Sequence, residues 1–342
     1  MRHLIVLLSV LVACDDETET ETEETIELAD YSAPGADTPG TFDERITGST
    51  GVALKIQVWF PTETAGDVVL YDGLLAGEAV DDARPLCDSP RPVLVFSHGN
   101  GGFRWQTAFL MEHLASHGWV VAAPDHTFNT FLDGDSEQFL DVILRRPVDL
   151  QDTYDWLVAQ SAASDSPLAG CIDEADGYAV SGHSFGGYTA YATAGADIID
   201  PYTEAVDNLG DPRVWAAIPL APWDAGGTID GGNAAIAVPV MTIGGTLDET
   251  TPWSMVSGLH ADVTVTPRYL AEMTTSGHYT YAPVACQIYA DGDGCGDSFL
   301  DLDIAAEIVN TATLSFLESI RLSPEAIDQL PAASDELIWT QE

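Results

Sequence analysis

The chain has 342 residues, of which 46% are hydrophobic, so it is long enough for one large domain with a sizeable core. Its 55 acidic and 11 basic residues give a net charge of −44, which argues against nucleic acid as a partner and against electrostatic binding to an anionic membrane. An acidic surface with a single lysine, Lys55, instead favours a salty exterior in which screening limits self-repulsion.

The first 45 residues are predicted to lie outside the folded domain. Arg2 and His3 precede an apolar run at 4–12 that is too short to span a bilayer, which is typical of a signal peptide. Leu11-Val12-Ala13-Cys14 resembles a bacterial lipobox, so we expect residues 1–13 to be removed and Cys14 to be lipidated. Residues 14–45 begin with an acidic, Thr- and Glu-rich run and are expected to form a disordered tether.

These features predict an exported bacterial lipoprotein of the cell envelope, held at the inner or outer membrane through its N-terminal lipid only, or a secreted protein. The alternative for residues 1–13 is an ordinary secretory signal that happens to lie near a cysteine.

Strand and helix patterns alternate from residue 46 to 322. Strands are predicted at 52–60, 68–71, 92–96, 119–123, 178–180, 214–220, 238–243 and 267–273. Helices are predicted at 103–117, in the stretch that ends near 163, from 188 onward, at 252–259 and at 302–320. This alternation predicts an α/β fold with a doubly wound, mostly parallel sheet flanked by helices, which binds ligands at the carboxyl ends of its strands. Residues 323–342 are expected to be a polar C-terminal tail.

A Gly-x-Ser-x-Gly pattern at 182–186 is centred on Ser184, between the strand at 178–180 and the following helix. A serine on such a sharp strand-to-helix turn projects its hydroxyl from the carboxyl edge of the sheet, and the glycines allow strand and helix to approach closely. Ser184 is therefore the predicted nucleophile. The alternative is a chance match in a glycine-containing loop.

A serine nucleophile needs a base and an acid, which follow it in the order acid, then histidine, in this architecture. Asp248 comes just after the strand at 238–243 and is the predicted acid, although its position also suits a helix N-cap. Asp224 and Glu249 are the alternatives. His278 follows the last strand and is the predicted base, because the other histidines lie in the leader, on helices, beside Ser184 or after earlier strands.

The turn Ser97-His-Gly-Asn-Gly-Gly102 follows the strand at 92–96 and can direct backbone N–H groups toward a developing oxyanion. We expect the backbone N–H groups of Asn100 and Phe185 to be the two donors. A tight turn without a catalytic role is the alternative. A phosphate-binding loop is excluded, because the turn lacks the required lysine.

With these motifs, residues 50–320 resemble the α/β-hydrolase superfamily. Ser97 to Arg104 and the segment Gly182-His-Ser-Phe-Gly-Gly187 look like the platelet-activating-factor acetylhydrolase and dienelactone-hydrolase-like groups. The segments 218–224 and 245–252 look like bacterial cutinases and polyester hydrolases, whose cleft tryptophan Trp223 matches. Polyester hydrolases usually carry an aromatic residue in place of Asn100 and a methionine in place of Phe185.

The resemblance implies a serine carboxylic-ester hydrolase that acts through an acyl-enzyme on short-to-medium acyl esters, including lipid-like esters. Trp223, Phe128 and Tyr279 are expected to line its substrate pocket. A cutinase-like polyester hydrolase is the alternative within enzymes, and a non-catalytic binding or adhesion module on the same fold is the alternative of another class. We expect no metal or organic cofactor, a small-molecule or lipid ester as the partner, and a monomer.

Four cysteines remain after Cys14, an even number in an exported chain. Cys87 and Cys171 precede two predicted strands by similar distances, so they can pair if those strands are parallel neighbours. Cys286 and Cys295 can close a short loop. Free buried thiols are the alternative. The run Asp291 to Asp297 is weakly similar to a calcium loop, but Cys295 takes a ligand position, which favours a disulfide-closed surface loop.

Overall fold

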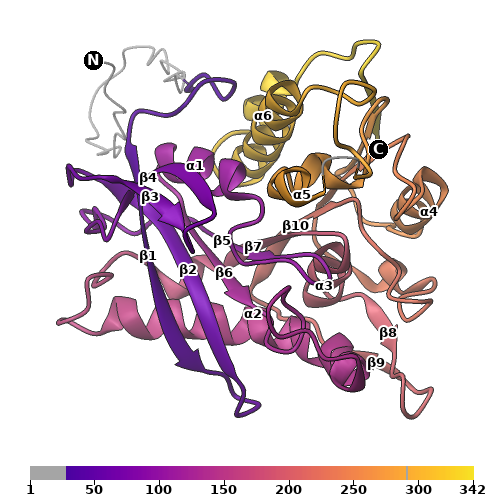
Figure 1. Ribbon diagram of the computed structural model, residues 1–342, viewed down its shortest axis with the longest axis horizontal. Helices are drawn as coiled ribbons and strands as arrows, with labels where there is room; N and C mark the ends of the chain where they lie inside the picture. The colour runs from indigo at the N-terminus through magenta and orange to yellow at the C-terminus, as the bar shows by residue number, and fades with distance from the viewer. Residues whose placement is uncertain (1–27, 290–291) are drawn as a thin grey trace, which may run out of the picture.

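The computed structural model describes residues 28–289 and 292–342 (Figure 1). The predicted signal peptide at 1–13, the lipidation site Cys14 and the first part of the tether lie outside the described residues, as does Asp291. The chain folds around an 11-stranded sheet whose strands run in the order β13-β12-β11-β10-β7-β5-β6-β2-β1-β4-β3. The predicted mostly parallel, doubly wound fold is confirmed.

The centre of the sheet is parallel, and most of its strands are continuous apolar runs that are buried on both faces, whereas the last, at 268–273, alternates between buried and half-buried residues. Because neighbouring parallel strands end at the same edge, the loops that follow them converge there. The central strands are β6 (Val120–Asp125), β5 (Val93–Ser97), β7 (Tyr178–His183), β10 (Val214–Leu220), β11 (Val240–Gly245) and β12 (Arg268–Met273).

Each margin of the sheet contains strands that were not predicted, namely β1 and β4 on one side and β13 on the other. On one side lie β2 (Ala53–Thr62), β1 (Thr38–Thr47), β4 (Leu75–Asp81) and β3 (Val68–Tyr71). On the other side β13 (Leu337–Gln341) pairs antiparallel with β12. Two short strands, β8 (Asp197–Ile199) and β9 (Val206–Asn208), form a separate sheet.

Two predicted boundaries are wrong. Residues 38–45, assigned to the tether, belong to β1, which pairs along its whole length with β2 and places Thr41 in the core. The predicted polar tail forms β13, because Leu337 is buried among core residues while its neighbours remain exposed. The first segment is mostly polar, and the apolar residues of the second form a run of only three at the end of a polar stretch, so neither is recognisable as a strand without its partner.

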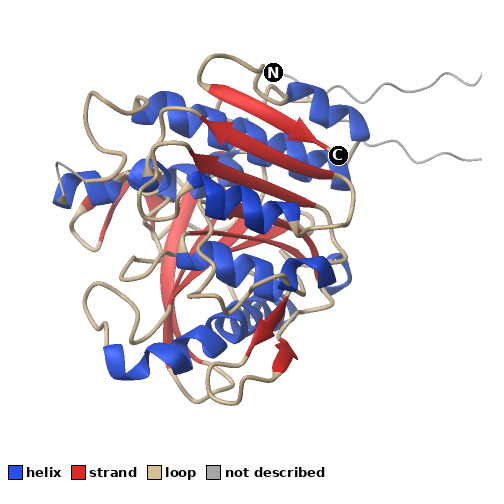
Figure 2. Cartoon of the chain, turned by 90° about the vertical axis from the view of Figure 1, so that its right-hand side faces the viewer, coloured by secondary structure: helices blue, strands red, loops and turns tan. Residues whose placement is uncertain are grey.

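Helices cover both faces of the sheet (Figure 2). α1 (Ala108–Ser116) and α6 (Leu302–Arg321) contribute to the apolar core on one face. α2 (Phe139–Ala162), α3 (Phe185–Thr193) and α4 (Trp253–Ala261) contribute to the core on the other. α5 (Val284–Ile288) is a short helix after β12, and 3-10 turns occupy Ser136–Gln138, Glu174–Asp176, Gly232–Ala235, His278–Tyr281 and Pro324–Gln329.

Both predicted disulfides are confirmed. Cys87 pairs with Cys171, consistent with β5 and β7 being parallel neighbours, and Cys286 pairs with Cys295. Disulfides are typical of exported proteins, in agreement with that part of the predicted localisation. Across residues 28–289 and 292–342, no helix has both the length and the apolar character that a membrane span requires.

Candidate active site

Ser184 lies at the sharp turn between β7 and α3, as predicted. Its backbone has φ 60° and ψ −116°, a conformation that non-glycine residues rarely adopt and that is commonly found at functional sites. The turn is tight enough to require glycine, because a Cβ on Gly186 would lie 1.9 Å from the Ser97 carbonyl oxygen. The Ser184 side chain is thereby held beside the loop that follows β5.

Asp248 and His278 lie together at the same sheet edge. His278 Nδ1 is 2.8 Å from Asp248 Oδ2, and both side chains are almost fully buried. The other carboxylate oxygen of Asp248 accepts the backbone N–H groups of Thr250 at 2.9 Å and Thr251 at 2.6 Å. These contacts orient the carboxylate toward the imidazole, and neither Asp224 nor Glu249 contacts His278 through its side chain in the described structure.

Backbone contacts connect this pair to the turn at Ser184. The Ser184 N–H donates to the Leu220 carbonyl at 2.9 Å, and the next carbonyl, of Ala221, accepts the Thr251 hydroxyl at 3.0 Å. The same Thr251 hydroxyl oxygen lies 2.8 Å from Asp248 Oδ2. The ends of β7, β10 and β11 thus bring the candidate nucleophile and acid to one place.

His183, next to Ser184, supports the backbone of His278 rather than replacing it as a base. Burial and the nearby His278 lower the pKa of His183 well below its usual value, so this imidazole is neutral. Its Nε2 lies 3.0 Å from the His278 carbonyl oxygen and its Nδ1 lies 3.0 Å from the Gln106 amide nitrogen. The two partners therefore define a tautomer in which Nε2–H donates and Nδ1 accepts.

Among the described residues, neither expected oxyanion donor has an acceptor for its backbone N–H. Phe185 is the first residue of α3, where backbone N–H groups have no partner within the helix. For Asn100, no acceptor of its N–H occurs among the residues that the structure describes. The turn before Asn100 approaches the nucleophile closely, because a Cβ on Gly99 would lie 3.4 Å from the Cβ of Ser184.

A buried arginine, Arg146, supports both donor segments and was not recognised from the sequence. Its guanidinium donates to Asn129 Oδ1, to the His98 carbonyl and, at 3.1 Å, to Ser97 Oγ. It also lies 4.4 Å from the centre of the Phe185 ring. Burial lowers the pKa of Arg146 to about 9. An Arg-Arg-Pro stretch within a predicted helix carries no signal that one arginine points inward.

Asn129 transmits this support to the oxyanion turn. Its side-chain amide donates to Asn100 Oδ1 at 2.7 Å, and its carbonyl accepts the Gly101 N–H at 3.1 Å. Behind it, His126 bridges Ser97 Oγ at 2.9 Å and Asp149 Oδ2 at 2.8 Å. This second Ser–His–Asp arrangement is fully buried, so it supports the turn from behind.

Residues 93–288, more than half of the chain, match the model of a family described as PET hydrolase-like. The chain belongs to the PET hydrolase-like family. It is therefore an α/β-hydrolase and a serine hydrolase of ester bonds, as predicted. This membership favours the enzyme over the non-catalytic module considered from the sequence.

A solved structure of similar fold is a ferulic acid esterase from Streptomyces cinnamoneus, with a TM-score of 0.65 and 20% sequence identity. The similarity covers 90% of this chain and 98% of that esterase. At this identity the likeness supports the fold. A comparison with curated proteins gave no match.

In this PET hydrolase-like chain, the three predicted pocket residues are half-buried on loops at the carboxyl edge of the sheet. Trp223 packs edge-on against Phe185, with ring centres 5.1 Å apart, and the backbone N–H of Trp223 donates to the Ser184 carbonyl at 3.0 Å. Tyr279 packs edge-on against His278 at 5.7 Å. Phe128 is farther out, with Arg145 over its ring at 5.7 Å. Trp223 therefore lies beside the turn at Ser184, and Tyr279 lies beside His278.

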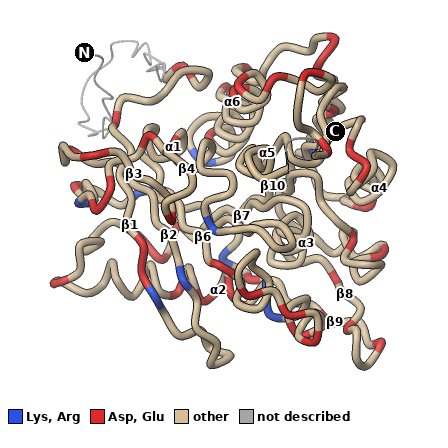
Figure 3. Tube along the Cα trace, viewed as in Figure 1, with Lys and Arg blue, Asp and Glu red and all other residues tan. Residues whose placement is uncertain are grey.

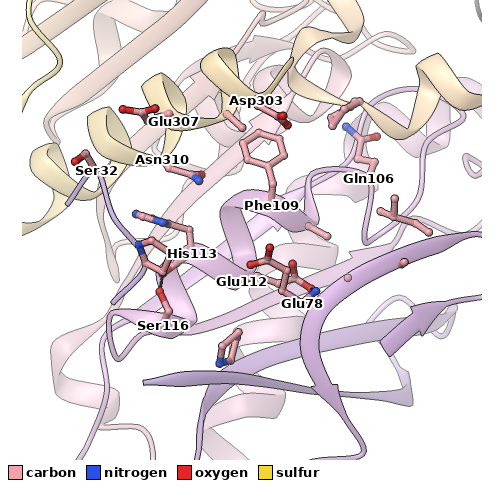
Figure 4. Close-up of a pocket in the computed structure, with 18 of the residues that line it drawn as sticks. Ser32, Glu78, Gln106, Phe109, Glu112, His113, Ser116, Asp303, Glu307 and Asn310 are labelled. Carbon is pink, nitrogen blue, oxygen red and sulfur yellow. Dashed lines mark hydrogen bonds between the residues drawn. The ribbon is translucent and has the colours of Figure 1, made fainter. Parts of the chain in front are cut away.

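A separate cavity of about 470 Å³ lies between the N-terminal segment, β4, α1 and α6 (Figure 4). Its wall includes the carboxylates of Glu78, Glu112, Asp303 and Glu307, and none of Ser184, Asp248 and His278 lines it. Glu112 is already used in the fold, since one oxygen accepts the Tyr71 hydroxyl at 2.7 Å and two backbone N–H groups of β4.

Proposed function

We propose that Ser184, His278 and Asp248 are the catalytic triad of this esterase. The buried 2.8 Å contact between His278 Nδ1 and Asp248 Oδ2 carries the proposal, because it presents the imidazole with Nδ1–H bonded and Nε2 available as a base. His183, the neighbouring histidine, has a structural partner at each ring nitrogen, so it does not compete for the role of base.

In the proposed reaction His278 removes the Ser184 proton as Oγ attacks the ester carbonyl. The resulting oxyanion is bound by the backbone N–H groups of Asn100 and Phe185. His278 then protonates the leaving alcohol, and the acyl group stays on Ser184. A water molecule, deprotonated by His278, attacks the acyl-enzyme, and the proton returns to Ser184 as the acid is released.

The proposed substrates are short-to-medium acyl esters, including lipid-like esters, taken up by a monomer. The half-buried ring of Trp223, which packs on the buried ring of Phe185, supports this choice, because it offers an apolar surface beside the nucleophile. The side chain of Asn100, where polyester hydrolases usually have an aromatic residue, leaves that side of the site polar.

Hydrolysis of polyesters is the second candidate, and the family match favours it. Large apolar side chains also remain exposed on loops at this edge: Phe131 at 53%, Leu132 at 82% and Leu247 at 43%. Exposed apolar groups of this kind suit a water-insoluble substrate.

Labelling with a fluorophosphonate tests the triad. We expect one adduct per chain, on Ser184, that is absent in Ser184→Ala and strongly slowed in His278→Ala and Asp248→Asn. Ser254→Ala, at an exposed position of α4, is the matched control and should label like the wild type. An equal labelling rate in His278→Ala would contradict the proposal.

An ester panel then separates the two substrate classes. Nitrophenyl esters of graded acyl length, a phospholipid and a polyester film are compared with the wild-type enzyme. Preference for short soluble esters with no release from the film supports the first candidate, and sustained release of soluble products from the film supports the second.

We also propose attachment to the cell envelope through a lipid on Cys14. Replacement Cys14→Ser should move the expressed protein from the membrane fraction to the soluble fraction, and an unchanged distribution would contradict the anchor.

A further inference from the structure

Asp293 lies in the loop closed by the Cys286–Cys295 disulfide, in the run that is weakly similar to a calcium site. Its carboxylate contacts the two loops that carry Asp248 and His278. Oδ1 accepts the backbone N–H of His278 at 3.0 Å. Oδ2 accepts the backbone N–H groups of Glu249 at 2.9 Å and Thr250 at 3.1 Å, and the Thr250 hydroxyl at 3.0 Å.

The main chain of the same residue adds a further contact. The Asp293 carbonyl accepts the N–H of Tyr279 at 2.6 Å. Asp293 therefore bonds to the backbone at 249 and 250, directly after the acid, and at 278 and 279, which include the base. These two loops are about 30 residues apart in the sequence and follow different strands, β11 and β12.

The Asp293 carboxylate lies so close to the backbone of the His278 loop that the adjacent positions require glycine. A Cβ on Gly277 would lie 2.4 Å from Asp293 Oδ1, and Gly294 has φ +99°, in the region that favours glycine. Hydrogen bonds to an ionised acceptor are roughly twice as strong as neutral ones. Both carboxylate oxygens face N–H or O–H donors, which is the opposite of what a cation ligand needs.

We propose that Asp293 is a positioning residue that holds the Asp248 and His278 loops in register, and that the Cys286–Cys295 disulfide holds Asp293 in place. The inference rests on the proposed function. It assigns the acidic disulfide loop a role in aligning the triad. Asp293 does not touch the reacting atoms, so its effect is on how often the pair is correctly aligned.

Asp293→Asn is the first test, since the side chain keeps its size. The asparagine side chain has only one oxygen, so its NH₂ group faces the N–H donors of one of the two loops, and the hydrogen bonds to that loop are lost. We expect kcat per active site to fall about 10- to 100-fold, with KM changed less than about 3-fold, because a displacement near 1 Å can cost about 10²-fold. Asp293→Ala should lose both connections and fall further.

Active sites are counted by fluorophosphonate stoichiometry, so that a loss of folded protein is separated from a loss of turnover. Asp297→Ala is the matched control, an exposed acid of the same segment, and should keep the wild-type kcat. Cys286→Ser combined with Cys295→Ser should lower kcat in the same direction by a smaller factor.

A kcat per labelled site within about 2-fold of the wild type in both Asp293 variants would overturn the inference, even if the Tm of these variants falls. Loss of this alignment is expected to lower kcat by more than about 2-fold. If the Asp293 variants only had fewer chains that label with fluorophosphonate, and kept the wild-type kcat per labelled site, Asp293 would have a purely structural role. Failure of the wild-type enzyme to label at Ser184 would instead contradict the proposed triad.

Discussion

At the scale of residues, the oxyanion turn depends on a side chain that never faces the substrate. Asn129 accepts from the buried Arg146 with Oδ1 and donates to Asn100 Oδ1 with its NH₂ group. Since the proposed donor at Asn100 is a backbone N–H, the Asn100 side chain serves to hold the turn. Removal of the Asn129–Asn100 hydrogen bond should therefore weaken stabilisation of the transition state more than it weakens substrate binding.

We expect Asn129→Ala to lower kcat about 10-fold with little change in KM, because one oxyanion donor is typically worth about 10²- to 10³-fold and the turn is loosened rather than removed. Asn100→Ala removes the same hydrogen bond from its other end and should give a similar loss. In a double-mutant cycle the combined variant should be no worse than either single variant. Additive losses would show that the two residues act independently.

The proposed triad could be read from the sequence because each of its three residues follows a strand in the required order. Ser184, Asp248 and His278 all lie where their strands end, and the structure brings the last two into contact. Arg146 and Asp293 were not predictable as site residues. An arginine on a helix and an aspartate in a loop are usually solvated, and only their burial and partners distinguish these two.

At the scale of elements, strands buried on both faces were predicted well and edge strands poorly. The buried strands read as continuous Val-, Ile- and Ala-rich runs, whereas β1 and β13 contain charged or polar residues that face solvent. The helix predicted at 103–117 begins only at Ala108. The Arg104 N–H and guanidinium are bonded to Asp125 at the end of β6, at 2.8 and 2.9 Å, which keeps this segment out of the helix.

The C-terminal strand offers a test of its contribution to stability. Leu337 is 1% exposed and packs in the main core, so Leu337→Ala should lower the free energy of unfolding by about 2–5 kcal/mol. Ile338→Ala is the control on the same strand, where the side chain is 46% exposed, and should change it by less than about 0.5 kcal/mol. Denaturant unfolding measures both. Equal, small effects would mean that β13 is not part of the cooperative core.

At the scale of the whole molecule, the charge is distributed unevenly between a few cations and many acids. Asp and Glu cover the loops and helix ends while Lys and Arg are sparse (Figure 3). Most of the cations in the described residues are already paired with carboxylates, including Lys55, Arg104 and Arg213. The acids outnumber the cations, so most acids in the described part of the chain are left without a counter-charge and repel one another.

We therefore expect salt to stabilise the folded domain. The Debye length falls from about 10 Å at 0.1 M to about 3 Å at 1 M, so molar NaCl should raise the Tm, by about 2–4 °C for each kcal/mol of repulsion screened. Thermal unfolding at pH 7 across a salt series measures this. A Tm that is as high in low salt as in molar salt would contradict the role of self-repulsion.

The sequence alone determined the fold class, the candidate triad, the two disulfides and the acidic character of this esterase. Each of these depends on local patterns: apolar period, glycine spacing and the order of residues after strands. The tertiary structure decided which polar residues support the triad and where the sheet ends. Arg146, Asn129 and Asp293 act through partners that are 15 to 49 positions away, and such contacts exist only once the strands are aligned in the sheet.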